Sequence, residues 1–419
     1  MRRWWRRPEL YGLLLRVLLM PLGAMGDLYG YYWVGHQFAY HGVIPLNHLG
    51  GYFAVWPPFY LHAAWLWLIR PLLGPGDPWG EGLIPSAALD PYWIGPEALG
   101  VFYAQLGAHR YWVLFLLKCP YLLTELLLVW LLLRQTTGEA ARRRLSWFLW
   151  LNPVTCFFVY LCGTWDIIPV TVMVGGLLLL PRQPGWAGLC WALAAIMKAF
   201  PVLLMPFVVL LGARTREDRV YLGASIVLPL LFFLLVGQSF GVSMLATAFG
   251  LPHYGMLTGA QLSLQPPHDR LYLFLVGYVV LLLHAGRRGE ASRLGLVRYG
   301  AAVLLGFYSL AFFHPQYFFW CLPLLAILVA EDRGLLKLFI LQVIGLGAYV
   351  LQFGPTFTTH LLAPLSPGVL LHARAPLERL SGVVDPGLFV GIAHSVFAAV
   401  SLWMAYEILR GHPRPRALS

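Results

Sequence analysis

Long apolar runs, repeated from near the start of the chain to near its end, limit the possible folds more than any other feature of this sequence. Hydrophobic residues make up 59% of the 419 residues and charged residues only 11%. A chain with so little polar surface cannot cover a water-soluble globule. Many runs approach the length that a helix needs to cross roughly 30 Å of hydrocarbon, and the alternating segments of a membrane barrel are absent. The sequence therefore predicts an all-α polytopic membrane protein.

Arginine-rich segments indicate how the chain is threaded. The formal net charge is +11, but the arginines fall in short clusters between apolar runs and do not line one polar face. This pattern favours a topology signal over a nucleic-acid surface, so we expect no nucleic acid partner. Because such clusters stay in the cytoplasm, all five should lie on one side of the membrane. They occupy residues 2–7, 134–144, 214–219, 287–298 and 410–416.

This rule also decides the role of residues 57–73. If that segment crossed the membrane, the arginines at 142–144 would lie outside. We therefore expect 57–73, which begins Pro-Pro and contains Arg70, to be an interfacial or re-entrant helix within one extracytoplasmic region, 26–110. A single transmembrane domain, 1–419, then has about twelve crossings and both termini in the cytoplasm. The predicted crossings are 9–25, 111–133, 146–162, 167–181, 186–198, 201–213, 221–237, 271–285, 296–313, 317–330, 335–354 and 388–409.

Two charged residues lie at or within predicted crossings, at positions that the topology signal does not explain. Asp27 follows the first crossing, and we expect it to open a long loop that begins with an aromatic, glycine-punctuated segment. A sugar-binding cleft needs such rings and a carboxylate. Lys198 interrupts an apolar stretch, LAAIMKAFPVLLMP, which we expect to break around it, and its ammonium needs an anion or water there. The structural alternatives are a helix-end acid in contact with water and a snorkelling lysine.

Other candidates share the predicted extracytoplasmic side. Lys118 and Glu125 lie two helical turns apart on one face of the second crossing, where pairing with neighbouring helices is as plausible as contact with a substrate. Asp166 lies in the short turn of CGTWDIIP. The five cysteines show no metal-ligand spacing, and no acidic cluster suits a divalent cation, so we expect neither metal nor cofactor. The remaining candidates are His36, Arg270, His314 and Gln316.

Seven motifs, in order and spacing over residues 26–320, resemble those of the GT-C membrane glycosyltransferases. The resemblance is to branches that use polyprenol-phosphate-mannose, namely the bacterial α-mannosyltransferases of glycosyltransferase family 87 and the catalytic subunits of GPI mannosyltransferase I. The motifs are GDLYGYYW (26–33), WPPFYLHAAWLWLI (56–69), LLKCPYLLTELLL (116–128), LNP (151–153), GTWD (163–166), IMKAFPVLLMP (196–206) and FFHPQYFFW (312–320).

The resemblance implies an inverting transfer of a hexose, mannose in those branches, from a polyprenyl-phosphate donor to a lipid or glycan acceptor on the extracytoplasmic face. It gives Asp27 the role of general base, and it places Trp56-Pro57-Pro58-Phe59 at the start of a surface helix. Lys118 and Glu125 match the basic residue and acid on the family's second crossing, and with His36, Asp166 and Gln316 they are candidates for substrate binding. Lys198, His314 and Arg270 are candidates for the donor phosphate.

Two features depart from the family pattern: no second acid occurs in residues 28–76, and the turn reads Gly-Thr-Trp-Asp where the family often has Gly-Gln-x-Asn/Asp. Two other functions suit the same composition. A lipid or glycan transporter or flippase also uses many crossings and broken helices, although such proteins usually contain repeats, which this sequence lacks. A ligase or polymerase that uses diphosphate-linked donors would keep the fold and change the donor.

Overall fold

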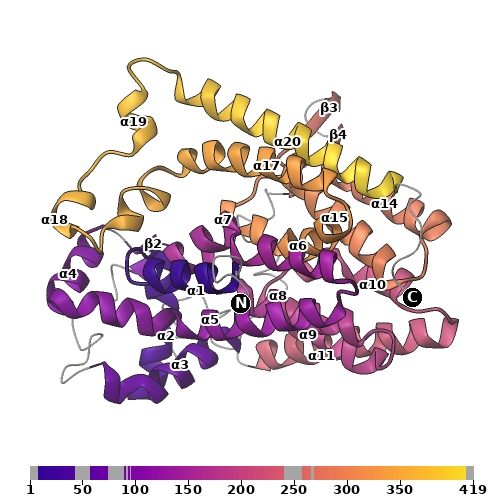
Figure 1. Ribbon diagram of the computed structural model, residues 1–419, viewed down its shortest axis with the longest axis horizontal. Coiled ribbons are helices and arrows are strands. Elements are labelled where there is room, and N and C mark those ends of the chain that lie inside the picture. The colour runs from indigo at the N-terminus through magenta and orange to yellow at the C-terminus, as the bar shows by residue number, and fades with distance from the viewer. Residues whose placement is uncertain are drawn as a thin grey trace, which may run out of the picture.

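The computed structural model describes residues 8–42, 57–73, 89–90, 93–94, 96–239, 257–265 and 269–411. Within these ranges helices dominate, and the strands form two short antiparallel hairpins (Figure 1). The longer helices are α1 (Pro8–Leu19), α2 (Gly26–His41), α3 (Pro57–Ile69), α4 (Pro96–Leu106), α5 (Arg110–Gln135), α6 (Glu139–Trp150), α8 (Ile167–Leu179), α9 (Pro184–Met197), α10 (Met205–Gly212), α11 (Arg216–Ser239), α14 (Leu273–Arg288), α15 (Arg293–Leu310), α16 (Leu322–Glu331), α17 (Gly334–Val350) and α20 (Pro386–Arg410).

Short elements connect these helices. The strands are β1 (Leu89–Asp90), β2 (Trp93–Ile94), β3 (Gln261–Gln265) and β4 (Asp269–Tyr272). The short helices are η3 (Arg70–Leu72), η5 (Gly107–His109), α7 (Pro153–Thr155), the π-helix η6 (Cys156–Cys162), η7 (Phe200–Leu203), η8 (Pro315–Cys321), η9 (Leu351–Phe357), η10 (His360–Leu362), α18 (Pro367–Leu370) and α19 (Pro376–Leu380).

The predicted all-α class is confirmed, and several helices have the length and composition of membrane crossings. Within the described ranges, five helical stretches are long and apolar enough to cross a membrane: Leu99–Gln135, Glu139–Cys162, Arg216–Ser239, Gly334–Phe357 and Pro386–Arg410. Three shorter apolar helices accompany them: Ile167–Leu179, Pro184–Met197 and Pro315–Glu331.

Large apolar side chains cover the outside of this bundle. On α11, Leu228, Phe232 and Leu235 are 63%, 69% and 69% exposed, and the outer faces of α14 and α20 are similar. Contiguous apolar surface of this kind is unfavourable in water, and it marks contact with a membrane or a partner. Together with the long apolar helices, this surface is that of a protein that lies in a membrane.

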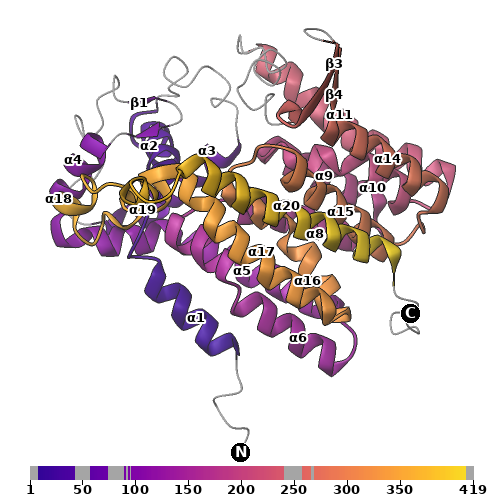
Figure 2. The ribbon, with the colours of Figure 1, turned by 90° about the horizontal axis from the view of Figure 1, so that it is seen from above.

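Segments rich in arginine, far apart in the sequence, contact one another at one end of the bundle. Arg293 Nη1 donates to Gln135 Oε1 at 2.6 Å, and Arg144 Nε donates to the Ala330 carbonyl at 2.8 Å. In Figure 2, α1 and α6 point to the lower edge, whereas α2, α3 and the β3–β4 hairpin lie at the upper edge. The contacts thus place clusters 134–144 and 287–298 together. Cluster 2–7 lies outside the described residues, and so does the part of cluster 410–416 that follows residue 411.

The residues after Asp27 form a helix, whereas the sequence pattern was interpreted as the opening of a loop. The signal was present, because Leu28, Tyr32 and His36 recur at a spacing of four and are buried along one face of α2. Helix α3 packs along α2, where a side chain at Gly35 would meet the Ala63 backbone nitrogen at 2.9 Å. Residues 57–73 are helical as predicted, and their position relative to a membrane stays a prediction.

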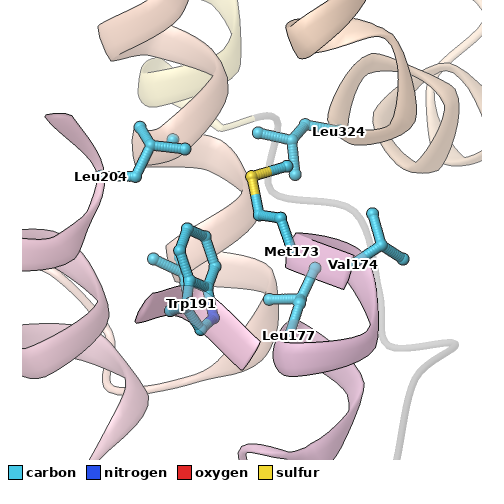
Figure 3. Close-up of a pocket in the computed structure, with 8 residues that line it drawn as sticks. Met173, Val174, Leu177, Trp191, Leu204 and Leu324 are labelled. Carbon is cyan, nitrogen blue, oxygen red and sulfur yellow. The ribbon is translucent and has the colours of Figure 1, made fainter. Parts of the chain in front are cut away.

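The centre of the bundle is closely packed. Met173, Val174 and Leu177 of α8 face Trp191 of α9, and Leu204 and Leu324 close the other side (Figure 3). The cavity between them measures about 10 Å³ and has only apolar walls. A space this small and apolar is a packing gap and not a ligand site.

Candidate active site

Four polar side chains from distant parts of the sequence meet beside the start of α2. Gln316 Nε2 donates to Asp27 Oδ2 at 3.3 Å, and Lys198 Nζ lies 3.5 Å from Asp166 Oδ1. Lys198 and Asp166 are both close enough to Asp27 to influence its ionisation. We call these residues, Asp27, Asp166, Lys198 and Gln316, the carboxylate–lysine cluster. All four were candidates from the sequence, and the fold brings them together across up to 289 positions.

Asp27 is held by the backbone that precedes it. The Met25 amide donates to the Cys162 carbonyl at 2.8 Å, and the Ala24 amide donates to the Leu361 carbonyl at 3.0 Å. The Asp27 side chain is half-buried and keeps some exposure. Loss of water around it raises its pKa, and the opposing effects of Lys198 and Gln316 do not cancel this rise. A partly accessible carboxylate of raised basicity is suited to accept a proton from a hydroxyl group.

Asp166 owes its position to a turn that only glycine allows. The π-helix η6 ends at Gly163, whose φ is 81° and whose Cβ position lies 3.0 Å from both Leu28 and Lys118 atoms. Asp166 precedes the first residue of α8, yet its carboxylate does not cap that helix. Instead, Trp320 Nε1 donates to Asp166 Oδ1 at 2.5 Å. The carboxylate is therefore oriented towards Lys198 and Trp320 and not towards its own helix.

Lys198 lies where the chain breaks between α9 and η7. Its backbone is extended, with φ −151° and ψ 131°, so the break that the sequence predicted around it is present. The ammonium stands over the rings of Trp165 and Tyr317, at 5.3 and 5.2 Å from their centroids. These rings and the Asp166 carboxylate offset the cost of burying the charge. The side chain is still 13% exposed, so the cation is not sealed off.

Aromatic rings form one wall of the cluster, and the sequence analysis missed their role. Trp320 stacks between Phe200 and Tyr317, with centroid distances of 4.4 and 4.1 Å. Tyr31 of α2 meets Trp165 edge-on at 5.8 Å. The rings of motifs 26–33, 163–166 and 312–320 were visible, but in a membrane protein aromatic residues also mark the interfaces. Composition therefore could not separate the two roles.

Two buried acceptor atoms of the cluster have no hydrogen-bond partner among the residues that the structure describes. They are Asp166 Oδ2 and Gln316 Oε1. Buried acceptors are nearly always satisfied in folded proteins. These two oxygens can each accept a hydrogen bond from a donor outside the protein, such as a hydroxyl group or water.

Lys118 lies outside this cluster and contacts the backbone. Its Nζ donates to the carbonyls of Met20 at 2.9 Å, Tyr160 at 2.7 Å and Leu161 at 3.1 Å, and also to that of Gly23. The side chain is completely buried. Lys118 connects α5 to the end of α1 and to η6. Its observed contacts are therefore with neighbouring helices, which is one of the two alternatives that the sequence left open.

Glu125 is also held by protein partners. Arg16 donates to it through Nε at 2.5 Å and Nη2 at 2.6 Å, and Tyr160 donates a further hydrogen bond. Arg16 Nη1 also donates to the Trp150 carbonyl at 2.6 Å. We call Arg16, Glu125 and Tyr160 the Arg16–Glu125 network. The sequence did not identify Arg16 as the partner, because the two residues are 109 positions apart.

The other three candidates lie at or beyond the edge of the cluster. The His314 ring lies 5.7 Å from that of Tyr317, which links it to Lys198. His36 stacks on Tyr40 at 4.4 Å, more than two helical turns after Asp27. Arg270 is exposed on the β3–β4 hairpin and donates to Gln261 at 3.4 Å. The described contacts therefore do not bring Arg270 to the cluster.

No metal-ligand group emerges from the part of the chain that the structure describes. There, no three side chains of His, Cys, Asp or Glu gather closely enough to hold an ion. The expectation of a metal-independent protein stays a prediction, to be tested with a chelator.

Comparison with known proteins adds no assignment: no family model, curated protein or solved structure matches this chain. The functional argument therefore depends on the residues and their geometry.

Proposed function

We propose that this protein is an inverting glycosyltransferase of the GT-C class that moves a hexose from a polyprenyl-phosphate donor to a lipid or glycan acceptor. The observation that supports this most is the proximity of Asp27 to Lys198. A half-buried carboxylate of raised pKa lies near a cation that stands over two aromatic rings. Inverting transfer requires a base and a group that stabilises a departing phosphate, and these residues supply both.

The proposed reaction is a single displacement. Asp27 accepts the proton of the acceptor hydroxyl while the hydroxyl oxygen attacks the anomeric carbon of the sugar. The bond from that carbon to the phosphate oxygen breaks, and the lipid phosphate leaves with the electron pair. Lys198 stabilises the negative charge that develops on this oxygen. The unpartnered oxygens of Asp166 and Gln316 accept hydrogen bonds from sugar hydroxyls, which orients the reacting carbon.

Asp166 then acts mainly by positioning Lys198. Asp166 Oδ1 already accepts a hydrogen bond from Trp320 Nε1 and lies 3.5 Å from the Lys198 ammonium. Asp166 is therefore a weaker candidate for the base than Asp27. His314, beside Tyr317, is the next candidate to contact the phosphate.

In the proposed architecture, about twelve crossings place both termini in the cytoplasm and the cluster on the extracytoplasmic side. The contacts among arginine-rich segments, at the end opposite α2 and α3 in Figure 2, support this orientation. Several predicted crossings correspond to short or broken helices, such as α9 and α10, which are tolerated where they line a cavity. The choice of mannose comes from the motif resemblance.

The test is transfer of a radiolabelled hexose by the purified full-length protein in detergent. Polyprenyl monophosphate and diphosphate donors are supplied in parallel with envelope lipid acceptors. Product from the monophosphate donor supports the proposal. Product from the diphosphate donor alone would instead identify the protein as a ligase or polymerase. Movement of labelled lipid or glycan across liposomes, without any product, would identify a transporter instead.

A further inference from the structure

A long groove lies on the outside of the bundle, between α6 and α17, with the end of α16 as part of its floor. Its volume is about 890 Å³, large enough for a drug-sized ligand or a lipid chain. Trp147 and Leu151 of α6 and Leu336 and Ile340 of α17 form exposed apolar walls. Phe148 and Phe339, with ring centroids 4.7 Å apart, lie beneath them. Apart from its ends, the groove is suited to hydrocarbon.

One end of the groove is positively charged. Arg143, Arg144 and Arg333 line it, and Glu139 is the one acid among the lining residues. Arg144 is occupied by the Ala330 carbonyl. Arg143 and Arg333 are exposed, and within the described ranges neither guanidinium group makes a hydrogen bond or an ion pair with the protein. Free guanidinium groups at the mouth of an apolar groove are complementary to an anionic head group above an acyl chain.

The length of the groove matches one leaflet of a bilayer. It runs along the chain from Glu139 to Pro153, which at 1.5 Å per helical residue is roughly 20 Å. Half of a bilayer, with its head-group region included, is also roughly 20 Å. The charged end belongs to the same end of the bundle as the arginine contacts around Gln135 and Ala330. A lipid with its head group there would place its chain beside Leu151 and Ile344.

We propose that this groove binds an anionic glycerophospholipid from the leaflet that faces the arginine-rich segments. Arg143 and Arg333 hold the phosphate, and α6 and α17 hold one acyl chain. The site is separate from the carboxylate–lysine cluster, because its lining residues do not include any member of that cluster. The inference therefore does not depend on the proposed transferase activity.

Native mass spectrometry of the full-length protein tests this directly, with phosphatidylglycerol and phosphatidylcholine added in equal amounts. We expect retained phosphatidylglycerol, and Arg143→Gln and Arg333→Gln should each weaken it roughly fivefold. Arg142→Gln is the matched control, because Arg142 is exposed in the same segment but does not line the groove. Ile340→Trp should fill the groove and expel the lipid, whereas Val280→Trp, on the outer face of α14, should not.

Three results would overturn the proposal. The first is equal loss in Arg142→Gln and Arg143→Gln, which would show attraction to net charge alone. The second is full displacement by glycerol phosphate at the concentration of the lipid, which would show an anion site without a chain. The third is a dimer that Ile340→Trp dissociates, which would show that a second copy of the chain covers the groove.

Discussion

Among the described residues, two groups that combine acidic and basic side chains in the interior differ in how completely the protein satisfies them. In the Arg16–Glu125 network both carboxylate oxygens are bound by protein donors, and Arg16 is fully buried. In the carboxylate–lysine cluster, Asp166 Oδ2 and Gln316 Oε1 have no partner among the described residues, while Asp27 and Lys198 keep some exposure. The comparison teaches that an incompletely satisfied polar group in a membrane protein is the better candidate for ligand contact.

The strongest test of this distinction is Asp27→Asn. It removes the base while it preserves shape, so turnover should fall about 100- to 10,000-fold with donor binding unchanged. Transfer kinetics and donor binding, measured on the same preparation, check this. Glu217→Gln, at an exposed acid at the start of α11, should retain full activity. Turnover like that of the unmodified protein would exclude Asp27 as the base.

The matching test in the Arg16–Glu125 network is Arg16→Met, which strands a buried carboxylate. We expect the free energy of unfolding in detergent to fall by about 3–5 kcal/mol. Turnover per folded molecule should stay within about twofold, because the network does not contact the cluster. Arg16→Met combined with Glu125→Leu should recover much of the stability. Unchanged stability with reduced turnover would instead place Glu125 in the substrate site.

A smaller effect is expected for Lys198→Met, since other groups near the phosphate remain. The apparent KM for the donor should rise, or kcat should fall, by about tenfold or more. Lys198→Arg should restore part of the activity because the charge is kept. Lys337→Met, at an exposed lysine of α17, serves as control. A kinetic profile equal to that of the control would identify Lys198 as a snorkelling lysine.

The pH profile separates the base from other roles of Asp27. A base must be deprotonated to work, so kcat/KM should fall as the pH drops through its pKa. Because burial raises the pKa of Asp27 above 3.8, this limb should lie at a higher pH than for an exposed aspartate. Rates measured from pH 4 to 8 test this, and the residual activity of Asp27→Asn should lack the limb. A limb that persists in that variant would belong to another group.

The smallest effect should come from a chelator. If protein side chains and not a metal ion stabilise the leaving group, excess EDTA should change turnover by less than about twofold. A large loss that Mg²⁺ or Mn²⁺ restores would show that the proposed mechanism lacks a component.

Some of the site could be predicted from single positions. Asp27, Asp166, Lys198 and Gln316 were candidates because each places a polar group beside an apolar run, where burial is costly. The aromatic partners could not be distinguished from interfacial residues. The bidentate partner of Glu125 was also hidden, because the pairing with Arg16 depends on how α1 is placed relative to α5 in the folded bundle. Helix α2 was missed although its buried residues recur every four positions, because its glycines and polar aromatics suggested a loop.

The sequence by itself determined the all-α class, the helical segment 57–73 and the break at Lys198. These depend on hydrophobicity and proline position, which act locally along the chain. Only the tertiary structure decided which charges face each other: Lys198 with Asp27 and Asp166, and Arg16 with Glu125. Such pairs form between helices whose packing is set by the shapes of many side chains at once, and no short stretch of sequence contains that information.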